Sequence, residues 1–571
     1  MASATWSTQP ATGDWNIAAH WYPAEVPTDT ATFGASTQTT ITFSKTGASV
    51  GAIEFSADAA SYTFQFGTST TPSLSVGGTG ISNLAAGPQQ FVVAATSTGY
   101  TNAQLQFSGS ASAGGSNVLY SVGPVTPAGY GGGVIGFVDQ ASAGSACFTV
   151  RTGAGAPPAT GSTVGGEVSF SDTATASTAT FTVYGSTSTA NGGDTFGNVV
   201  FHNSSTAAHG TFKNIGGTLP GCDGGNTQFY DTATAAQGIF VNLGGTVGGA
   251  NGGDVAFDGT AGAGSGHFIN QAAPVAGAYG GVTSFNNNGP TLSSGGASAG
   301  SATIINCGAE QAAVGGGGHT SFSAAYGWPT ADQATIINQG STLATSSCAG
   351  HTIFSSPPGK SFYPTAGGAT IRNLGAPGPG GVGGYTQFTV YNATTTPNYP
   401  RAGSAFLINE GGDGENAPGG STQFSANASA ESATLIAHGG SNGGQGGQII
   451  FAAESVGDAA SVTLSGNGTL SLATHDGALT LSCLTAQGGI ITTQLGSYPT
   501  TLAVSSTLSV PAAPVTFQLV AGAGCNPGVR YPILTAPQVG TLPASSFAAI
   551  APAGQTATLS SEGSTLYVTL N

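Results

Sequence analysis

The chain has 571 residues and a formal net charge of −16, yet only 5% of its residues are charged, against about 25% in an ordinary soluble domain. Lys and Arg together number 7 and form no cluster, which excludes nucleic acid and anionic membrane surfaces as partners because both require basic patches. No apolar stretch reaches the roughly 18 residues that a membrane-spanning helix needs, so we expect no membrane insertion.

Residues 1–130 hold three of the four tryptophans, Trp6, Trp15 and Trp21, together with short alternating stretches such as 61–66. Helix-forming patterns are nearly absent from the whole chain, because Met occurs once and Lys and Glu are scarce. We therefore expect an all-β chain in which residues 1–130 form an N-terminal β cap and irregular coils. The first residues lack the basic and apolar segments of a signal peptide, so export is expected to use a segment that is not present in this chain.

Residues 131–466 carry an internal repeat that is marked by eleven phenylalanines spaced 27 to 37 residues apart. Glycine stands four residues before each of them, and a β-branched residue stands two residues before. Because side chains alternate along a strand, the β-branched residue and the phenylalanine share one face. The marking residues are Phe137, Phe170, Phe201, Phe229, Phe257, Phe285, Phe322, Phe354, Phe388, Phe424 and Phe451.

A second apolar anchor follows each phenylalanine, usually eleven residues later, and predicts a second strand in every repeat. Two residues after this anchor, asparagine recurs in seven consecutive repeats on the apolar face of the strand. A buried amide is costly unless it is hydrogen-bonded, but stacked amides can bond to one another along a column. The sequence therefore predicts a structural Asn ladder that consists of Asn214, Asn242, Asn270, Asn306, Asn338, Asn373 and Asn409.

A single repeat cannot bury its apolar face alone, whereas stacked repeats form a continuous core. We therefore predict an elongated β-solenoid, or β-helix, of about eleven regular coils in residues 131–466. Residues 467–571 contain alternating Leu and Val and are expected to form a C-terminal β cap that hides the open strand edge. The sequence leaves open whether each coil is triangular or a flat two-sided loop.

The two ends of the chain resemble a known family. Residues 15–21, WNIAAHW, and residues 29–34, DTATFG, resemble the opening of bacterial secreted proteins with autotransporter-associated β-strand repeats. Residues 531–535, YPILT, and the last stretch at 563–570 are similar to the closing strands of autotransporter-like passengers. The resemblance implies a largely solenoidal protein that is exported to the cell surface or the medium and has a structural or adhesive role.

Four consecutive repeats carry insertions between the phenylalanine and the second anchor, which lie 19, 14, 17 and 19 residues apart there. Insertions at one place in adjacent coils lie side by side. Exposed rings and arginine dominate partner contacts, so we predict a partner-binding or glycan-binding flank; the alternative is that these rings only cover long loops. The residues of this aromatic flank are Tyr326, Trp328, Lys360, Phe362, Tyr363, Tyr391, Tyr399 and Arg401.

Other kinds of site find little support in the sequence. His319 and His351 are expected to stack on neighbouring coils, but no third ligand accompanies them, so we predict no metal site and no cofactor. A β-helix polysaccharide lyase or hydrolase needs clustered carboxylates, which the 23 scattered acidic residues do not provide, so no catalytic residue is assigned. The 6 cysteines are compatible with disulfides in an oxidising compartment or with free buried thiols.

The low content of charged residues and the regular repeat predict an extracellular or cell-surface structural protein that self-assembles into a filament or surface layer. The reason is that a chain with so few charged side chains has little Coulomb repulsion to separate its copies. One alternative is a polysaccharide-binding surface module that uses the aromatic flank. The other is a β-helix polysaccharide lyase or hydrolase. The expected partners are further copies of the chain, as a homo-oligomer or homopolymer, and polysaccharide.

Overall fold

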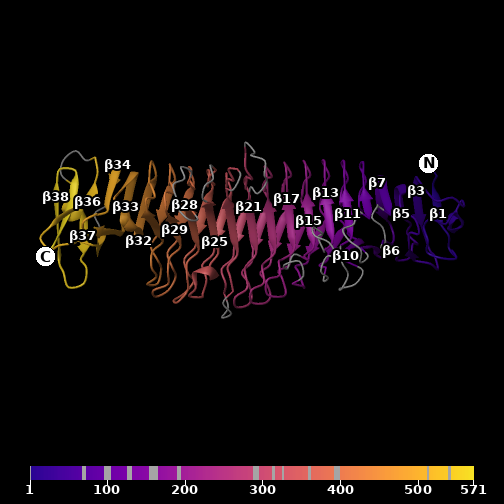
Figure 1. Cartoon of the computed structure of the whole chain (residues 1–571), viewed down its shortest axis with the longest axis horizontal. Helices are drawn as coiled ribbons and strands as arrows, with labels where there is room; N and C mark the ends of the chain where they lie inside the picture. Colours follow the sequence, from indigo (N-terminus) through magenta and orange to yellow (C-terminus); the bar gives the residue numbers. More distant parts are fainter. Residues whose placement is uncertain are drawn as a thin grey trace. The chain divides into compact units, whose positions relative to one another are not determined.

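The computed structural model shows an all-β chain (Figure 1), as the sequence predicts. The described residues form 39 strands, and helix is limited there to three short 3-10 turns, η1 (Ala18–His20), η3 (Ser346–Cys348) and η4 (Ala544–Ser546). None of these helical turns is long and apolar enough to cross a membrane. The structure describes residues 2–66, 73–95, 104–124, 132–153, 165–189, 195–286, 295–310, 315–324, 327–357, 362–390, 399–510, 514–537 and 542–571.

The chain divides into two compact units, Met1–Thr283 and Ser284–Asn571, which we call unit 1 and unit 2. Each unit is a β-solenoid, and each of its regular coils contributes one short strand to each of two parallel ladders. The fold class predicted from the repeat is thereby confirmed. The division at residues 130 and 466 follows sequence character and stays a prediction.

Unit 1 begins with an antiparallel pair of short strands, β1 (Ala4–Trp6) and β2 (Trp21–Tyr22). The three tryptophans of this region are buried, and Trp21 lies 4.9 Å from the ring of Trp6 and 4.9 Å from that of Trp15. Three rings in edge-to-face contact bury a large apolar area. The cluster therefore closes the core of unit 1 beside its first strands.

Two parallel ladders build the rest of unit 1, and its neighbouring regular coils are paired residue for residue. The first ladder contains β3 (Thr30–Phe33), β5 (Ala48–Phe55), β7 (Leu74–Asn83), β9 (Leu105–Phe107), β11 (Val134–Phe137), β13 (Glu167–Phe170), β15 (Asn198–Phe201), β17 (Asn226–Phe229) and β19 (Asp254–Phe257). The second ladder contains β4 (Thr40–Ile41), β6 (Thr63–Phe66), β8 (Gln89–Ala95), β10 (Val118–Pro124), β12 (Cys147–Val150), β14 (Thr180–Val183), β16 (Thr211–Asn214), β18 (Ile239–Asn242) and β20 (His267–Asn270).

A row of single parallel bridges lies between the two strands of each regular coil, for example from Ser142 to Thr175 and from Thr175 to Thr206. On either side of this bridge row the chain turns through left-handed backbone, as at Asp172 (φ 58°) and Ser177 (φ 51°). Each regular coil therefore has three straight stretches separated by tight turns, a feature that the sequence left open.

Unit 2 repeats the two ladders after β21 (Val282–Asn286), the strand at which the units are divided. Its first ladder contains β23 (His319–Ser323), β25 (His351–Ser356), β27 (Tyr385–Val390), β29 (Ser421–Phe424) and β31 (Gln448–Ala453). Its second ladder contains β22 (Thr303–Asn306), β24 (Thr335–Asn338), β26 (Thr370–Asn373), β28 (Phe406–Asn409) and β30 (Thr434–Ala437). Longer strands follow, namely β32 (Ser461–His475), β33 (Ala478–Leu495), β34 (Thr501–Ser509) and β35 (Val515–Ala521), and the short strand β37 (Phe547–Ile550) pairs in parallel with β35.

Antiparallel strands close the C-terminal end of unit 2. The strand β36 (Arg530–Thr535) pairs on one side with β34 in parallel and on the other with β39 (Thr565–Leu570) in antiparallel orientation. The strand β39 in turn pairs antiparallel with β38 (Ala557–Glu562). The β38–β39 hairpin therefore covers an edge of β36 that would otherwise expose unpaired backbone groups.

Stacked phenylalanine rings fill the core. In unit 1 they form two columns, with centroids 4.6 to 4.8 Å apart between neighbouring regular coils and edge-to-face contacts of 5.8 to 6.1 Å between the columns. In unit 2 one column continues from Phe285 to Phe451, while buried Ile, Leu and Val replace the other. Each aromatic pair adds about 0.5–1.5 kcal/mol beyond its buried area, so the columns hold coils in register.

Candidate functional site

The seven asparagines of the predicted ladder are fully buried. Within each unit, neighbouring ladder residues are joined amide to amide at 2.8 or 2.9 Å. In unit 2, Asn338 donates to the side chain of Asn373 and to the backbone carbonyl of Tyr385. It accepts from the amide of Asn306 and from the hydroxyl of Thr352. Both polar groups of this buried amide are thus bonded, and the ladder holds the coils together rather than forming a reactive site.

Threonines of the β-branched position are the hydroxyl partners of the ladder, and the sequence prediction missed this role. Each one donates to the asparagine about one strand earlier at 2.9 to 3.0 Å. The sequence does carry a signal for this role, since a threonine at the β-branched position follows every ladder asparagine except Asn242, which Val255 follows. Where the asparagine position holds Val183 instead, the next β-branched position holds Val199. The donors are Thr227, Thr283, Thr320, Thr352, Thr386 and Thr422.

Four residues of the predicted aromatic flank form two contacts in unit 2. Trp328 and Phe362 meet edge to face with ring centroids 4.9 Å apart, and Trp328 remains 37% exposed. The guanidinium carbon of Arg401 lies 4.0 Å from the centroid of the Tyr363 ring. Arg401 also bonds to the carboxylate of Glu431 at 3.0 Å. The flank thus presents a partly exposed tryptophan and a cation held over a ring.

The bridge row of unit 2 explains why these segments are neighbours, because Thr330 is bridged to Thr365 and Thr365 to Arg401. Tyr399 lies two residues before Arg401 and is partly exposed, with no ring contact to other flank residues in the described part of the chain. The remaining predicted flank residues, Tyr326, Lys360 and Tyr391, lie outside the described residues.

Three aromatic side chains stack on the outer face of the first ladder in unit 2. The rings of His319 and His351 are 5.1 Å apart, and those of His351 and Tyr385 are 4.8 Å apart, with interplanar angles of 4° and 5°. Burial, followed by the neighbouring His351, lowers the pKa of His319 to about 3. Burial also lowers the pKa of His351, so both rings are neutral near pH 7.

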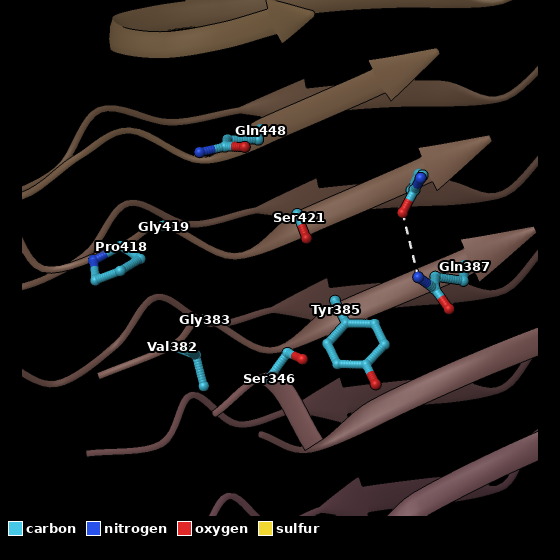
Figure 2. Close-up of a pocket in the computed structure, with 10 residues that line it drawn as sticks. Ser346, Val382, Gly383, Tyr385, Gln387, Pro418, Gly419, Ser421 and Gln448 are labelled. Carbon is cyan, nitrogen blue, oxygen red and sulfur yellow. Dashed lines mark hydrogen bonds between the residues drawn. The ribbon is translucent and has the colours of Figure 1, made fainter. Parts of the chain in front are cut away.

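A groove with a volume of about 330 Å³ lies beside this column of rings. Figure 2 shows Ser421 between Gln448 and Tyr385 on three neighbouring strands at the groove. The sequence prediction missed the groove, because part of its wall comes from loops whose path the repeat does not specify. The lining residues are Ser346, Val382, Gly383, Tyr385, Gln387, Pro418, Gly419, Ser421, Gln423 and Gln448.

Arg372, Glu410 and His438 form a polar cluster beside the second ladder of unit 2, which the sequence analysis did not predict. Glu410 accepts hydrogen bonds from Arg372 and from His438, each at 2.7 Å. Partial burial acts to raise the pKa of Glu410, but these two bonds outweigh burial and lower that pKa. Exposed pairs of this kind contribute about 0–1 kcal/mol, so the cluster is a modest link between coils.

The cysteines form no disulfide: all six are free thiols, and Cys222 and Cys348 are buried. Burial, followed by the charge of Glu310, raises the pKa of Cys307 to about 11, which keeps that thiol protonated and weakly nucleophilic near neutral pH. Across the described ranges, no group of three His, Cys, Asp or Glu side chains is placed to hold a metal ion.

The candidate sites are therefore the aromatic flank and the groove beside Tyr385, both in unit 2. No protein-family model matches the chain, and a search of the curated proteins gives no match.

Proposed function

We propose that the chain is an extracellular or cell-surface structural protein whose copies assemble side by side. The observation that supports this role best is that the side chains that repeat from coil to coil are the inward ones. The stacked phenylalanines and bonded asparagines face the core, whereas one outward position of the first ladder changes along unit 1, from Glu167 through Asn226 to Asp254. An array of identical binding sites would need the same outward residues in every coil. A repeat in which only the inward residues recur is instead typical of a scaffold.

Charge and exposed aromatic surface support lateral assembly. Only 5% of the residues are charged, so most of the surface along which two copies could meet carries no charge that contact would have to desolvate. Trp328 is exposed beside Phe362, and aromatic residues and arginine are enriched where proteins meet. In unit 2 the β38–β39 hairpin covers the edge of β36, which favours side-by-side over end-to-end contacts. The resemblance of both chain ends to secreted passengers supports a location outside the cell.

Sedimentation velocity over a concentration series tests the flank as the contact between copies. We expect the wild-type chain to form larger species as concentration rises and Trp328→Ser to shift the distribution towards single chains. Tyr498→Ser is the matched control, because Tyr498 is an 86% exposed aromatic residue elsewhere in unit 2. Assembly that persists unchanged in Trp328→Ser would remove the flank from the proposal.

Polysaccharide binding by the flank is a second candidate, favoured by the exposed indole of Trp328 and by Arg401 over the ring of Tyr363. In gels that contain a neutral polysaccharide, the wild-type chain is expected to be retarded and Trp328→Ser to migrate faster. Equal migration of the two chains in every polysaccharide would contradict this candidate.

A further inference from the structure

The groove beside Tyr385 lies where a column of rings ends. His319, His351 and Tyr385 occupy successive register positions on β23, β25 and β27. The next two positions of the same row hold Ser421 and Gln448. Successive coils lie about 4.8 Å apart, and a serine fills much less of that spacing than a ring does. The groove therefore lies where the next ring of the column would stand (Figure 2).

Glutamine side chains place hydrogen-bonding groups along this space. The amide nitrogen of Gln387 donates to the amide oxygen of Gln423 at 3.2 Å, the bond drawn as a dashed line in Figure 2. This bond orients both amides and leaves the oxygen of Gln387 and the NH₂ group of Gln423 as acceptor and donor for a ligand. The hydroxyl of Ser421 and the amide of Gln448 line the same groove.

The lining also indicates the charge of the ligand. None of the ten lining residues carries a charged side chain, and the chain as a whole has a net charge of −16, which disfavours anions. A volume of about 330 Å³ is at the lower end of the range for small-molecule sites, about 300–1,000 Å³. One aromatic wall combined with several neutral polar groups suits a ring that has an apolar face and many hydroxyls.

We propose that this groove binds a sugar residue of a neutral polysaccharide, with the apolar face of the sugar against Tyr385. The hydroxyls of the sugar bond to Gln423, Gln448 and Ser421, which lie on the two coils beyond the ring column. This binding role goes beyond the scaffold role and does not depend on it, because the groove lies on the first ladder and the flank lies on the bridge row.

Saturation-transfer NMR of the full chain with short neutral oligosaccharides of glucose, galactose, mannose and xylose tests the site. The wild-type chain is expected to bind at least one of them. Ser421→Tyr continues the ring column and fills the groove, and the neighbouring coil already holds Tyr385 at this register position. Its affinity is expected to fall about tenfold or more. Asn226→Tyr, the matched control, adds the same ring at the equivalent position of unit 1 and should leave binding unchanged.

A second variant removes hydrogen bonding without filling the groove. Gln423→Ile copies Ile450, which occupies this register position in the next coil, so the fold should tolerate it while the affinity falls several-fold. The proposal is overturned when no neutral oligosaccharide binds, when only uronic-acid oligosaccharides bind, or when Ser421→Tyr binds as the wild type does. Loss of binding in Trp328→Ser but not in Ser421→Tyr would also overturn it and place the sugar on the flank.

Discussion

An asparagine in the core of this protein is stabilising only as a member of a bonded column. Asn338 exchanges amide hydrogen bonds with the coils on both sides and accepts a threonine hydroxyl as well. A satisfied buried hydrogen bond contributes about 1 kcal/mol, whereas an unsatisfied buried group costs about 1–3 kcal/mol. A coil that slips out of register would leave several such groups unsatisfied, so the ladder specifies the stacking of coils as well as stabilising it.

Replacing one ladder residue is therefore expected to cost more than its own bonds. Asn338→Val leaves the amide of Asn306 and the hydroxyl of Thr352 without this partner, and the free energy of unfolding should fall by about 3 kcal/mol. The double variant Asn338→Val/Thr352→Val copies the Val183 and Val199 pair of unit 1 and should recover part of the loss. Urea denaturation followed by circular dichroism measures both. A double variant less stable than the single variant would contradict this account.

The stacked histidines predict a stability that decreases with falling pH. Folding lowers the pKa of His319 from 6.5 to about 3. Above pH 6.5 this group is neutral in both states and has no effect. Between pH 6.5 and about 3 the unfolded chain binds the proton and the folded chain does not, so the free energy of unfolding falls as the pH falls.

Comparison with His319→Gln/His351→Gln isolates this effect from the titration of carboxylates. Chemical denaturation at a series of pH values between about 7 and about 5 should show a smaller loss of stability in the double variant than in the wild-type chain. Parallel pH profiles for the two proteins would show that the histidines bind protons alike in the folded and unfolded states.

At the scale of the element, a row of hydrogen-bonded Asp and Asn side chains runs along the outer turns of unit 1. Asp139, Asp172, Asn203 and Asp231 have φ values of 56° to 58°, in the left-handed region. Asp172, Asn203 and Asp231 each accept a hydrogen bond from the backbone N–H of the turn residue one coil earlier, at 2.9 to 3.1 Å. Asp and Asn tolerate left-handed backbone better than other residues with a Cβ, so one residue type both forms the turn and links the coils.

Asp172→Ala is expected to lower the free energy of unfolding by about 2 kcal/mol, from left-handed strain and the lost bond to the N–H of Asp139. The matched control is Asp172→Asn, because Asn203 has the same role in the next coil, and its effect should stay within about 0.5 kcal/mol. Thermal unfolding measures the loss, and hydrogen exchange of the Asp139 amide localises it. Equal destabilisation by Ala and Asn would show that the side-chain bond is unimportant.

The elements that repeat were predictable from the sequence, and those that occur once were not. Phe137 and its equivalents recur at one register position, so the fold class and the ring column follow from their spacing. The groove depends on a single event, the replacement of a ring by Ser421, and on loop paths that no periodicity describes. Composition likewise indicated Trp328 and Phe362 as flank residues, but their edge-to-face contact depends on the fold of the insertions.

At the scale of the whole molecule, the C-terminal hairpin is expected to limit how copies associate. Arg530 on β36 bonds to Glu562 on β38 at 2.6 Å and lies 3.7 Å from the ring centroid of Tyr567 on β39. Deleting residues 556–571 removes β38 and β39 and uncovers the edge of β36. The truncated chain should associate at lower concentration than the full chain, because an open strand edge pairs with other strands.

Mass photometry of both chains over one concentration series measures this difference. Glu562→Gln is the control that removes the ion pair and leaves the hairpin strands in place, and it should behave as the full chain does. A truncated chain that stays as dispersed as the full chain would show that the edge of β36 is not a site of association.

The central claim is that the protein is a structural scaffold whose copies assemble side by side, and negative-stain electron microscopy over a concentration series tests it most directly. The account predicts assemblies of uniform width that grow with concentration in the wild-type chain and are lost in Trp328→Ser. Single particles at every concentration, in the wild-type chain as in the variant, would contradict it.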